Sequence, residues 1–312
     1  VGCIAACQLN IPIVHFEGCW HSYDWRMPED KYRRIIDQVS DVIYTYFPEH
    51  KLQGMVGGLN QKSIVVTYGN PIVEILQTYY YDRKAQFDAM STSEFFSSRG
   101  IAKGQYYLMT CHRRENVHIR SSFEAILKLI EQARYPIYFP ASYRTQKVLQ
   151  EYGLTLPKHV RMVDPIGYVE FVALMTNSRG VITDSGTVVE ETCFLQIPSL
   201  QMRKATERPQ TYDVGSSAKF DPAEPVKYPV DVVFAKFDAL YGKTWPNPMG
   251  DGKASERIVA DLLRRLDETD DGSGPGFRMH APELSHYWTG RSYGEDGLPT
   301  PVVERVRERV MA

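Results

Sequence analysis

The stretch Gly-Val-Ile-Thr-Asp-Ser-Gly-Thr-Val-Val-Glu-Glu-Thr-Cys-Phe, residues 180–194, decides the fold. Its first part, 180–182, is a short apolar run that predicts a buried strand, and its last part, 188–194, has the pattern of a helix. The polar turn between them places a helix N-terminus at the carboxyl end of a strand. This arrangement is typical of a Rossmann-like unit, in which the free N–H groups of the helix start bind anions.

The same alternation of strand and helix patterns continues on both sides of this stretch. Strands are predicted at 105–109, 136–139, 160–163 and 199–202, and helices at 123–133, 145–152 and 168–176. A second series nearer the N-terminus has strands at 11–16, 42–46 and 63–67, with helices that start near Pro28 and Asn70. This alternation predicts parallel, doubly wound sheets, and 312 residues suit two domains. The expected fold class is therefore α/β, with two Rossmann-like domains.

Composition and charge argue against several classes of function. Hydrophobic residues make up 43% and charged residues 24%, as in ordinary globular proteins, and the formal net charge is -2. A chain with this net charge does not attract the negative charges of nucleic acid or of an anionic membrane, so we predict neither partner. Five cysteines without a Cys-x-x-Cys pair argue against zinc and a disulfide framework, and favour a reducing, cytoplasmic location. No apolar run approaches the roughly 20 residues that span a bilayer.

Polar residues follow three of the predicted strands. Ser185 and Gly186 follow one strand, where a hydroxyl group and a backbone without Cβ suit a phosphate. His112 and Arg113 follow a second strand, and Arg208 follows a third. Because the carboxyl ends of parallel strands share one edge of a sheet, we expect these groups to surround one anionic ligand. Each motif alone also fits an ordinary capped helix or a solvated polar loop.

Two carboxylates stand out near the N-terminus. Glu17 leaves the strand at 11–16, and Glu29 opens the next helix. Two carboxylates brought together in a cleft repel each other, so one gains a raised pKa and serves as an acid while the other serves as a base. We therefore predict that Glu17 and Glu29 are catalytic candidates. The alternative is that Glu29 only stabilises its helix, because the helix dipole favours a carboxylate in the first turn.

Taken in order, these segments resemble the non-hydrolysing UDP-N-acetylglucosamine 2-epimerases. The resemblance rests on an ordered series of motifs: His-Phe-Glu-Gly-Cys (15–19), Pro-Glu-Asp followed by Arg-Arg (28–34), Thr-Tyr-Gly-Asn (67–70), Thr-Cys-His-Arg-Arg-Glu-Asn (110–116), Asp-Ser-Gly-Thr-Val-Val-Glu-Glu (184–191), Thr-Glu-Arg-Pro (206–209) and Asn-Pro-Met-Gly-Asp-Gly-Lys-Ala-Ser (247–255). It covers roughly residues 1–266. Such a series is far more specific than a single glycine pattern.

The resemblance implies a GT-B type fold, in which two Rossmann-like domains face each other across a cleft. On that basis, residues 1–97 are the remainder of the N-terminal domain, 98–254 are the C-terminal UDP-binding domain, and 255–266 form a helix that crosses back to the first domain. The chain starts without Met in what looks like the middle of a helix, so we expect the first domain to be incomplete by about a hundred residues. Residues 267–312 are a linker and a tail of unknown role, with a short helix predicted at 301–311.

The resemblance also implies that the second domain binds the UDP half of the substrate through six residues: Arg113, Phe171, Ser185, Gly186, Glu191 and Arg208. Arg113 would contact the phosphates together with His112, and the Ser-Gly pair would hold the diphosphate. Glu191 would bind the ribose hydroxyls, and Phe171 would lie against the uracil ring, where stacking immobilises few torsion angles. Arg208 would support the phosphate loop.

The activity that the resemblance implies is inversion at C2 of the sugar, which interconverts UDP-N-acetylglucosamine and UDP-N-acetylmannosamine. The family eliminates UDP to leave a 2-acetamidoglucal and then adds UDP back, with the new proton delivered to the other face. C2–H is weakly acidic, so its removal must be coupled to the loss of a good leaving group. This implies catalysis by Glu17, Glu29 and His112 in a homodimer, with a UDP-sugar as substrate and with no cofactor and no metal.

The sequence departs from the family at several positions. The second Gly of Asp-Ser-Gly-Gly is Thr187, a regulatory-site His is Ser142, and the sugar-facing Gly-Leu-Arg-Thr is Cys-Trp-His-Ser at 19–22. A third catalytic carboxylate of the family would lie upstream, so the activity is predicted for the intact parent protein. Three alternatives stay open: a GT-B glycosyltransferase that uses the same UDP site, a hydrolysing 2-epimerase, and an inactive UDP-sugar-binding protein.

Overall fold

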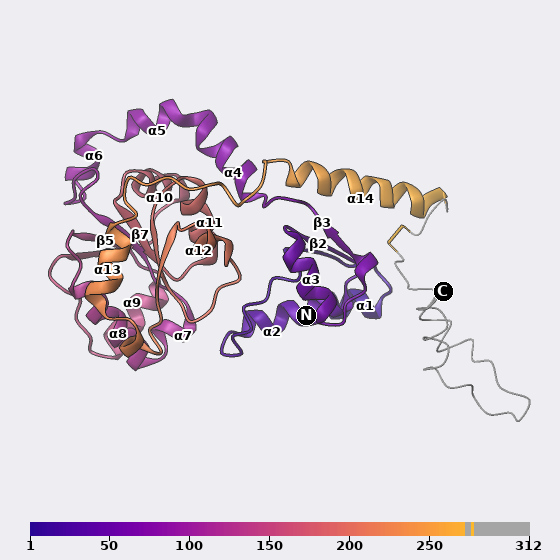
Figure 1. Cartoon of the computed structure of the whole chain (residues 1–312), viewed down its shortest axis with the longest axis horizontal. Coiled ribbons are helices and arrows are strands. Elements are labelled where there is room, and N and C mark those ends of the chain that lie inside the picture. The colour runs from indigo at the N-terminus through magenta and orange to yellow at the C-terminus, as the bar shows by residue number, and fades with distance from the viewer. Residues whose placement is uncertain (272–275, 278–312) are drawn as a thin grey trace, which may run out of the picture. The chain divides into compact units, whose positions relative to one another are not determined.

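A computed structural model of the chain describes residues 1–271 and 276–277 (Figure 1). The chain divides into two compact units. The first unit comprises residues 1–19, 36–66 and the described residues from 259 onward, and the second comprises 20–35 and 67–258. The predicted domain limits stay a prediction, and the helix predicted at 301–311 lies outside the described residues.

The second unit is built on a six-stranded parallel sheet with the strand order β6-β5-β4-β7-β8-β9. The strands are β4 (Tyr107–Thr110), β5 (Ile137–Pro140), β6 (Val160–Val163), β7 (Gly180–Thr183), β8 (Ser199–Met202) and β9 (Ser217–Phe220). The chain builds outward from β4 to β6, returns to the centre, and builds outward again from β7 to β9. The point between β4 and β7 is therefore a topological switch point, where open α/β sheets bind their ligands. The prediction of a doubly wound sheet is confirmed.

Helices cover both faces of this sheet, as Figure 1 shows. They are α4 (Ile72–Tyr79), α5 (Lys84–Met90), α6 (Ser93–Ser97), α7 (Arg114–Val117), α8 (Arg120–Glu131), α9 (Tyr143–Glu151), α10 (Tyr168–Thr176), α11 (Gly186–Phe194), α12 (Gln210–Asp213) and α13 (Val230–Asp238), with the 3-10 turns η2 (Tyr81–Arg83) and η3 (Pro225–Lys227). Tyr107 and Met109 point into the hydrophobic cluster beneath α8, α9 and α13, and Leu108 points into the cluster beneath α10. The strands read as apolar runs because both faces are buried. Among the described residues, no helix is long and apolar enough to cross a membrane.

The first unit contains a smaller parallel sheet with the order β1-β2-β3. Its elements are β1 (Val14–Phe16), β2 (Val42–Thr45) and β3 (Ile64–Val66), with α1 (Gly2–Gln8), α3 (Pro48–Val56) and the 3-10 turn η1 (Gln61–Ser63). All four residues of the central strand β2 are buried. Two helices, α2 (Pro28–Val39) and α14 (Ala254–Asp271), have residues in both units.

Several elements differ from the sequence-based expectation. Strand β9 and helices α3, α5, α6, α7, α12 and α13 are not predicted. Helix α13 directly follows Pro229 in a proline-containing stretch, where local breakers obscure the helical pattern. Helix α14 continues to Asp271, beyond the expected end at residue 266. The ion pairs of Arg264 with Asp261 and Glu268 on one face of α14 support this extension.

The chain that leads into α14 is held close to the chain that leads into α4. The backbone N–H of Asn70 donates to the carbonyl of Met249 at 2.8 Å, and Gly69 forms an isolated bridge with Gly250. Gly250 has a φ of +95°, and a Cβ atom there would lie 2.4 Å from Cα of Gly69 and 2.8 Å from the carbonyl oxygen of Tyr68. Both neighbours are backbone atoms that cannot rotate away, so only glycine fits this position.

We expect Gly250→Ala to lower the free energy of unfolding of the second unit by about 2–4 kcal/mol, because a collision with backbone is added to conformational strain. Urea unfolding followed by circular dichroism measures this loss. The matched control is Gly242→Ala, because Gly242 has a φ of +77° and no atom within 4 Å of an added Cβ. The control should lose only about 1 kcal/mol. Equal losses in the two variants would contradict the proposed collision.

Candidate functional site

A buried carboxylate ties together the loops that follow β4 and β7. Asp184 lies directly after β7 and is fully buried. Its carboxylate accepts the backbone N–H of Arg113 at 2.9 Å and of His112 at 3.0 Å, and the side-chain amide of Asn116 at 3.1 Å. Asn116 also donates to the carbonyl of Met202 at 2.9 Å, which brings in the end of β8. Three donors on one carboxylate fix the course of the His-Arg loop at the switch point.

The helix that follows β7 starts at the same point. Ser185 is the N-cap of α11: its Oγ accepts the N–H of Val188 at 3.4 Å, and its own N–H donates to Oγ1 of Thr183 at 2.9 Å. Gly186 is the first helical residue, and a Cβ atom there would lie 2.7 Å from Cζ of Arg208. Glycine therefore lets a guanidinium group lie directly beside the positive end of the helix. Both groups favour an anion at this place.

A pocket with a volume of about 220 Å³ opens at this edge of the sheet. It is lined by residues from the loops after β4, β5, β6 and β7 and from helices α10 and α11, among them His112, Ser142, Pro165, Phe171, Ser185 and Val188. The side chain of His112 is 49% exposed, and its Nδ1 lies 3.5 Å from a carboxylate oxygen of Asp184. The pocket thus combines an apolar wall with a small number of polar groups, as is usual for a small-molecule site.

A second buried acid lies on α11 on the same side of the sheet. Glu191 is only 3% exposed and accepts a hydrogen bond from the hydroxyl group of Tyr168 at 2.9 Å. Burial raises the pKa of Glu191 to about 7, and the negative charge of Glu190 adds to this shift, whereas the hydroxyl of Tyr168 opposes it. The carboxyl group of Glu191 is therefore poised to change its charge near neutral pH.

Four arginines surround one buried carboxylate. Glu207 pairs with Nη2 of Arg203 at 2.8 Å, with Nη1 of Arg208 at 3.2 Å and with Nη1 of Arg33 at 3.4 Å. Burial pushes the pKa of Glu207 upward, but the surrounding positive charges, Arg203 first and Arg113 among them, hold the pKa well below its ordinary range. Glu207 is thus ionised, and the cluster keeps a surplus of positive charge that suits a polyanionic ligand.

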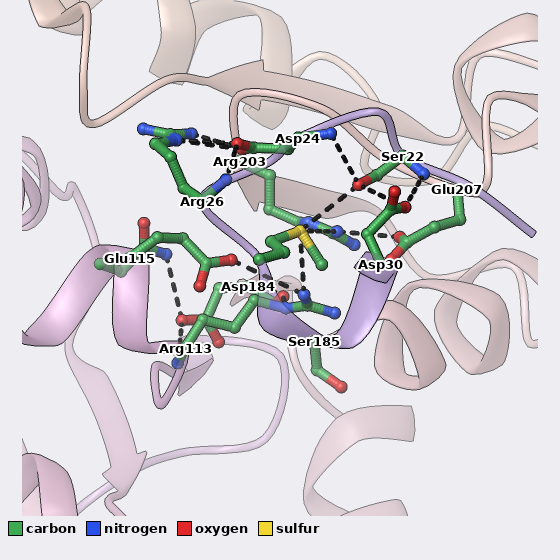
Figure 2. A network of polar contacts seen from close by, with 12 residues as sticks. Ser22, Asp24, Arg26, Asp30, Arg113, Glu115, Asp184, Ser185, Arg203 and Glu207 are labelled. Atoms are coloured by element: carbon green, nitrogen blue, oxygen red, sulfur yellow. Dashed lines mark hydrogen bonds and ion pairs between the residues drawn. The ribbon is translucent and has the colours of Figure 1, made fainter. Parts of the chain in front are cut away.

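Residues 20–35, which precede and open α2, supply further partners to this cluster (Figure 2). The thioether sulfur of Met27 accepts weak hydrogen bonds from Nη1 of Arg113 at 3.5 Å and from Nη2 of Arg203 at 3.6 Å. The backbone N–H of Ser22 donates to Asp30 at 2.6 Å and fixes this segment. Because a thioether carries no charge, it orients the two guanidinium groups without neutralising them.

The structure brings several predicted residues together, and two others belong to different units. His112 and Ser185 line one pocket, as expected from the strand order, and Phe171, which the family resemblance names, lines the same pocket. Glu29 is exposed in the first turn of α2 and belongs to the second unit, whereas Glu17 follows β1 in the first unit. The pairing of these two carboxylates therefore stays a prediction. No group of three or more His, Cys, Asp or Glu side chains within the described residues is arranged to hold a metal ion.

Sequence reasoning does not predict several residues of the site, among them Asp184, Asn116, Tyr168 and Met27. Asp184 and Asn116 lie inside the quoted motifs. The position of Asp184 directly after β7, with the Asn116 motif following the neighbouring strand β4, is a usable signal for a contact that fixes the loop. Tyr168 and Met27 had no such signal, because their roles depend on contacts with residues far away in the chain.

We expect Asp184→Asn to lower the free energy of unfolding of the second unit by about 2–4 kcal/mol, because the amide adds a donor where three donors already converge. Urea unfolding measures the change. The control is Asp164→Asn, since Asp164 is exposed and accepts a single side-chain hydrogen bond from Gln146. This control should stay within about 0.5 kcal/mol of the wild type. A variant at position 184 as stable as the control would refute the fixing role.

Comparison with known proteins identifies the family. The family model for UDP-N-acetylglucosamine 2-epimerase matches residues 1–263. The UDP-N-acetylglucosamine 2-epimerase of Methanocaldococcus jannaschii is 33% identical over 271 residues, which are 84% of this chain and 71% of that protein. A UDP-2,3-diacetamido-2,3-dideoxy-D-glucuronate 2-epimerase of Pseudomonas aeruginosa is 28% identical over 273 residues, which are 85% of this chain and 71% of that protein.

Solved structures agree with this assignment. The crystal structure of the M. jannaschii enzyme in complex with UDP-GlcNAc and UDP matches with a TM-score of 0.73 and 30% identity. The match covers 84% of this chain and 72% of that one. The predicted GT-B type fold class is thereby confirmed. The switch-point geometry and these matches agree, and the chain belongs to the UDP-N-acetylglucosamine 2-epimerase family.

Proposed function

We propose that this protein is a non-hydrolysing epimerase that interconverts UDP-N-acetylglucosamine and UDP-N-acetylmannosamine. One observation carries the proposal: the His112–Arg113 loop and the capped start of α11 meet at the switch point, beside a pocket with an aromatic wall. An anion site next to a ring-sized pocket suits the diphosphate and the base of a uridine nucleotide. Family membership supports the same substrate class.

The binding half of the site is proposed to hold UDP through the second unit. Ser185 and Gly186 would offer N–H groups and a hydroxyl to the diphosphate, because they form the start of α11. Phe171, which lines the pocket, would lie against the uracil ring, and Glu191 would accept hydrogen bonds from the ribose hydroxyls. Arg113 and Arg208 would supply positive charge to the phosphates from the surrounding arginine cluster.

The proposed chemistry is elimination followed by re-addition. A carboxylate removes the proton at C2, the C1–O bond breaks with its electron pair going to UDP, and a C1–C2 double bond forms. UDP then adds back at C1 while the other carboxyl group delivers a proton to the opposite face of C2. Glu17 and Glu29 are proposed for the two proton transfers, and His112 would stabilise the charge that develops on the departing phosphate.

A second candidate substrate is a UDP-2,3-diacetamido-2,3-dideoxy-glucuronate. The observation in its favour is the 28% identity to the P. aeruginosa 2-epimerase that carries this substrate in its name. The stretch 19–22 also departs from the sugar-facing pattern of the family. The UDP half of the site would serve both sugars, so a comparison of kcat/KM for the two nucleotides separates them.

We also propose a homodimer in a reducing, cytoplasmic setting. The dimer follows from the family resemblance. All five cysteines are free thiols in the structure, which suits a compartment that keeps thiols reduced.

Incubation of UDP-N-acetylglucosamine with the protein in D2O should produce UDP-N-acetylmannosamine with deuterium at C2, because re-protonation draws on solvent. Proton NMR follows both the new sugar and the lost C2 proton. The experiment uses this chain and a version extended upstream, since the chain spans 71% of the length of the M. jannaschii relative. Free N-acetylmannosamine with UDP would indicate a hydrolysing enzyme. No exchange in either version despite UDP binding would leave a transferase or a binding protein.

Glu17→Gln and Glu29→Gln should each slow this exchange by at least about 100-fold, because each removes a proton-transfer group. Affinity for UDP, measured by calorimetry, should stay unchanged in both variants. Glu49→Gln is the matched control for Glu29, because Glu49 is an exposed carboxylate in the first turn of α3. If Glu29→Gln behaves like this control, Glu29 only stabilises its helix.

Affinity for UDP-N-acetylglucosamine should rise as the pH increases from 6 to 8. Burial places the pKa of Glu191 at about 7 in the free protein, and ribose hydroxyls that donate to the carboxylate favour its ionised form. Binding therefore releases a proton from Glu191. For each unit by which the ligand lowers the pKa of Glu191, the ionised protein binds the ligand about tenfold more tightly than the protonated protein does. Both phosphates of this ligand are esterified and do not titrate in this range.

Calorimetry in two buffers of different ionisation enthalpy measures both the affinity and the proton release. Glu191→Gln should abolish the pH dependence, whereas Glu170→Gln should preserve it, because Glu170 pairs with Arg99 instead. A pH dependence that survives in Glu191→Gln would refute the ribose-binding role.

A further inference from the structure

An indole ring lies beside one of the phosphate-site arginines. Trp20 is fully buried, and Cζ of Arg208 lies 4.6 Å from the centroid of its ring. This distance is within the range of about 6 Å over which an aromatic face attracts a cation. Trp20 lies in the stretch 19–22, which departs from the family pattern.

The N–H groups of Arg208 pair with two carboxylates. Its Nε donates to Glu190 at 2.6 Å, and its Nη1 pairs with Glu207 at 3.2 Å. Beside the guanidinium group, Gly186 opens α11 so closely that a Cβ atom there would lie 2.7 Å from Cζ of Arg208. The side chain of Arg208 is only 4% exposed. With Trp20 over the guanidinium group, few other side-chain conformations are open to Arg208.

The chemistry of the ring matters because Arg208 already pairs with two carboxylates, Glu190 and Glu207. A third carboxylate in place of the ring would add more negative charge beside the guanidinium group and weaken its attraction for an anion. An aromatic face stabilises a buried cation by its quadrupole and adds no negative charge. The sulfur atom of Met27 likewise contacts the guanidinium groups of Arg113 and Arg203 without adding negative charge. Two uncharged side chains of one segment thus contact three arginines of the cluster.

We propose that Trp20 is a positioning residue of the UDP site, which keeps the guanidinium group of Arg208 beside the first turn of α11 so that both act on the same phosphate oxygens. The inference rests on the proposed function, because it requires a diphosphate at the start of α11. Trp20 acts only through Arg208, so its removal weakens the binding of phosphates and leaves the binding of the nucleoside unchanged.

The test compares UDP with uridine as ligands of the full chain by titration calorimetry. Trp20→Leu should weaken UDP binding by on the order of tenfold, and Trp20→Phe, which keeps an aromatic face, should weaken it less. Uridine carries no phosphate, so its affinity should stay within about twofold of the wild type in both variants. A merely structural role would weaken the binding of both ligands.

The matched control is Trp245→Leu. Trp245 is a second buried tryptophan of the same unit, and its indole nitrogen donates to the carbonyl of Cys193 at 2.8 Å. The control should lower the unfolding temperature comparably but leave the ratio of UDP to uridine affinity at the wild-type value. The inference is overturned if Trp20→Leu binds UDP like the wild type, or if Trp245→Leu changes this ratio as much.

A double-mutant cycle with Arg208→Lys supplies an independent check, since Lys keeps a positive charge beside Glu190 and Glu207 and so preserves the fold. In this background Trp20→Leu should have little further effect on UDP affinity, because the planar group that it positions is gone. Additive effects would overturn the inference. If the wild-type chain fails to bind UDP, the proposed function is refuted. If the wild type binds UDP and Trp20→Leu binds it equally well, only the role of Trp20 is refuted.

Discussion

The candidate site depends on the buried carboxylate of Asp184. It lies at the carboxyl end of a central strand, where the chain reverses its direction of winding, and it accepts N–H groups from the backbone of His112 and Arg113 and from the side chain of Asn116. A buried charge without partners would be very unfavourable, so these donors must stay in place. The loop that carries His112 and Arg113 is therefore tied to the sheet at this point.

Next to this loop the protein buries positively charged side chains, among them Arg203 and Arg208. Glu207 supplies the counter-charge that makes burial of several guanidinium groups tolerable, and Trp20 and Met27 orient three of them without further neutralisation. A site with more carboxylates would be more stable when empty but would bind a diphosphate less well. The cluster combines a shared central acid, Glu207, with uncharged partners such as Trp20 and Met27, and this combination suits a ligand that brings its own negative charge.

Much of this arrangement could be predicted from the sequence, because the fold depends on local patterns. Apolar runs alternating with helical patterns gave the central strands and most of the helices around them, and motifs after strands pointed to His112, Arg113 and Ser185. Strand β9 and helix α13 were missed because the alternation of β9 is short and prolines surround α13. The partners Trp20, Met27 and Tyr168 could not be found in this way, since they approach the site only through tertiary packing.

The close approach of Gly186 and Arg208 also constrains how the site can change over evolutionary time. No side chain fits at position 186 while a guanidinium group lies 2.7 Å from where its Cβ would stand. An uncharged residue at 208 would relieve the crowding but would leave Glu190 and Glu207 without the cation that they share. A substitution at either position therefore requires compensating changes at the others. We expect Gly186, Glu190, Glu207 and Arg208 to be conserved together. If this start of α11 holds the nucleotide, as proposed, evolutionary change in the site falls mainly on the residues around the sugar.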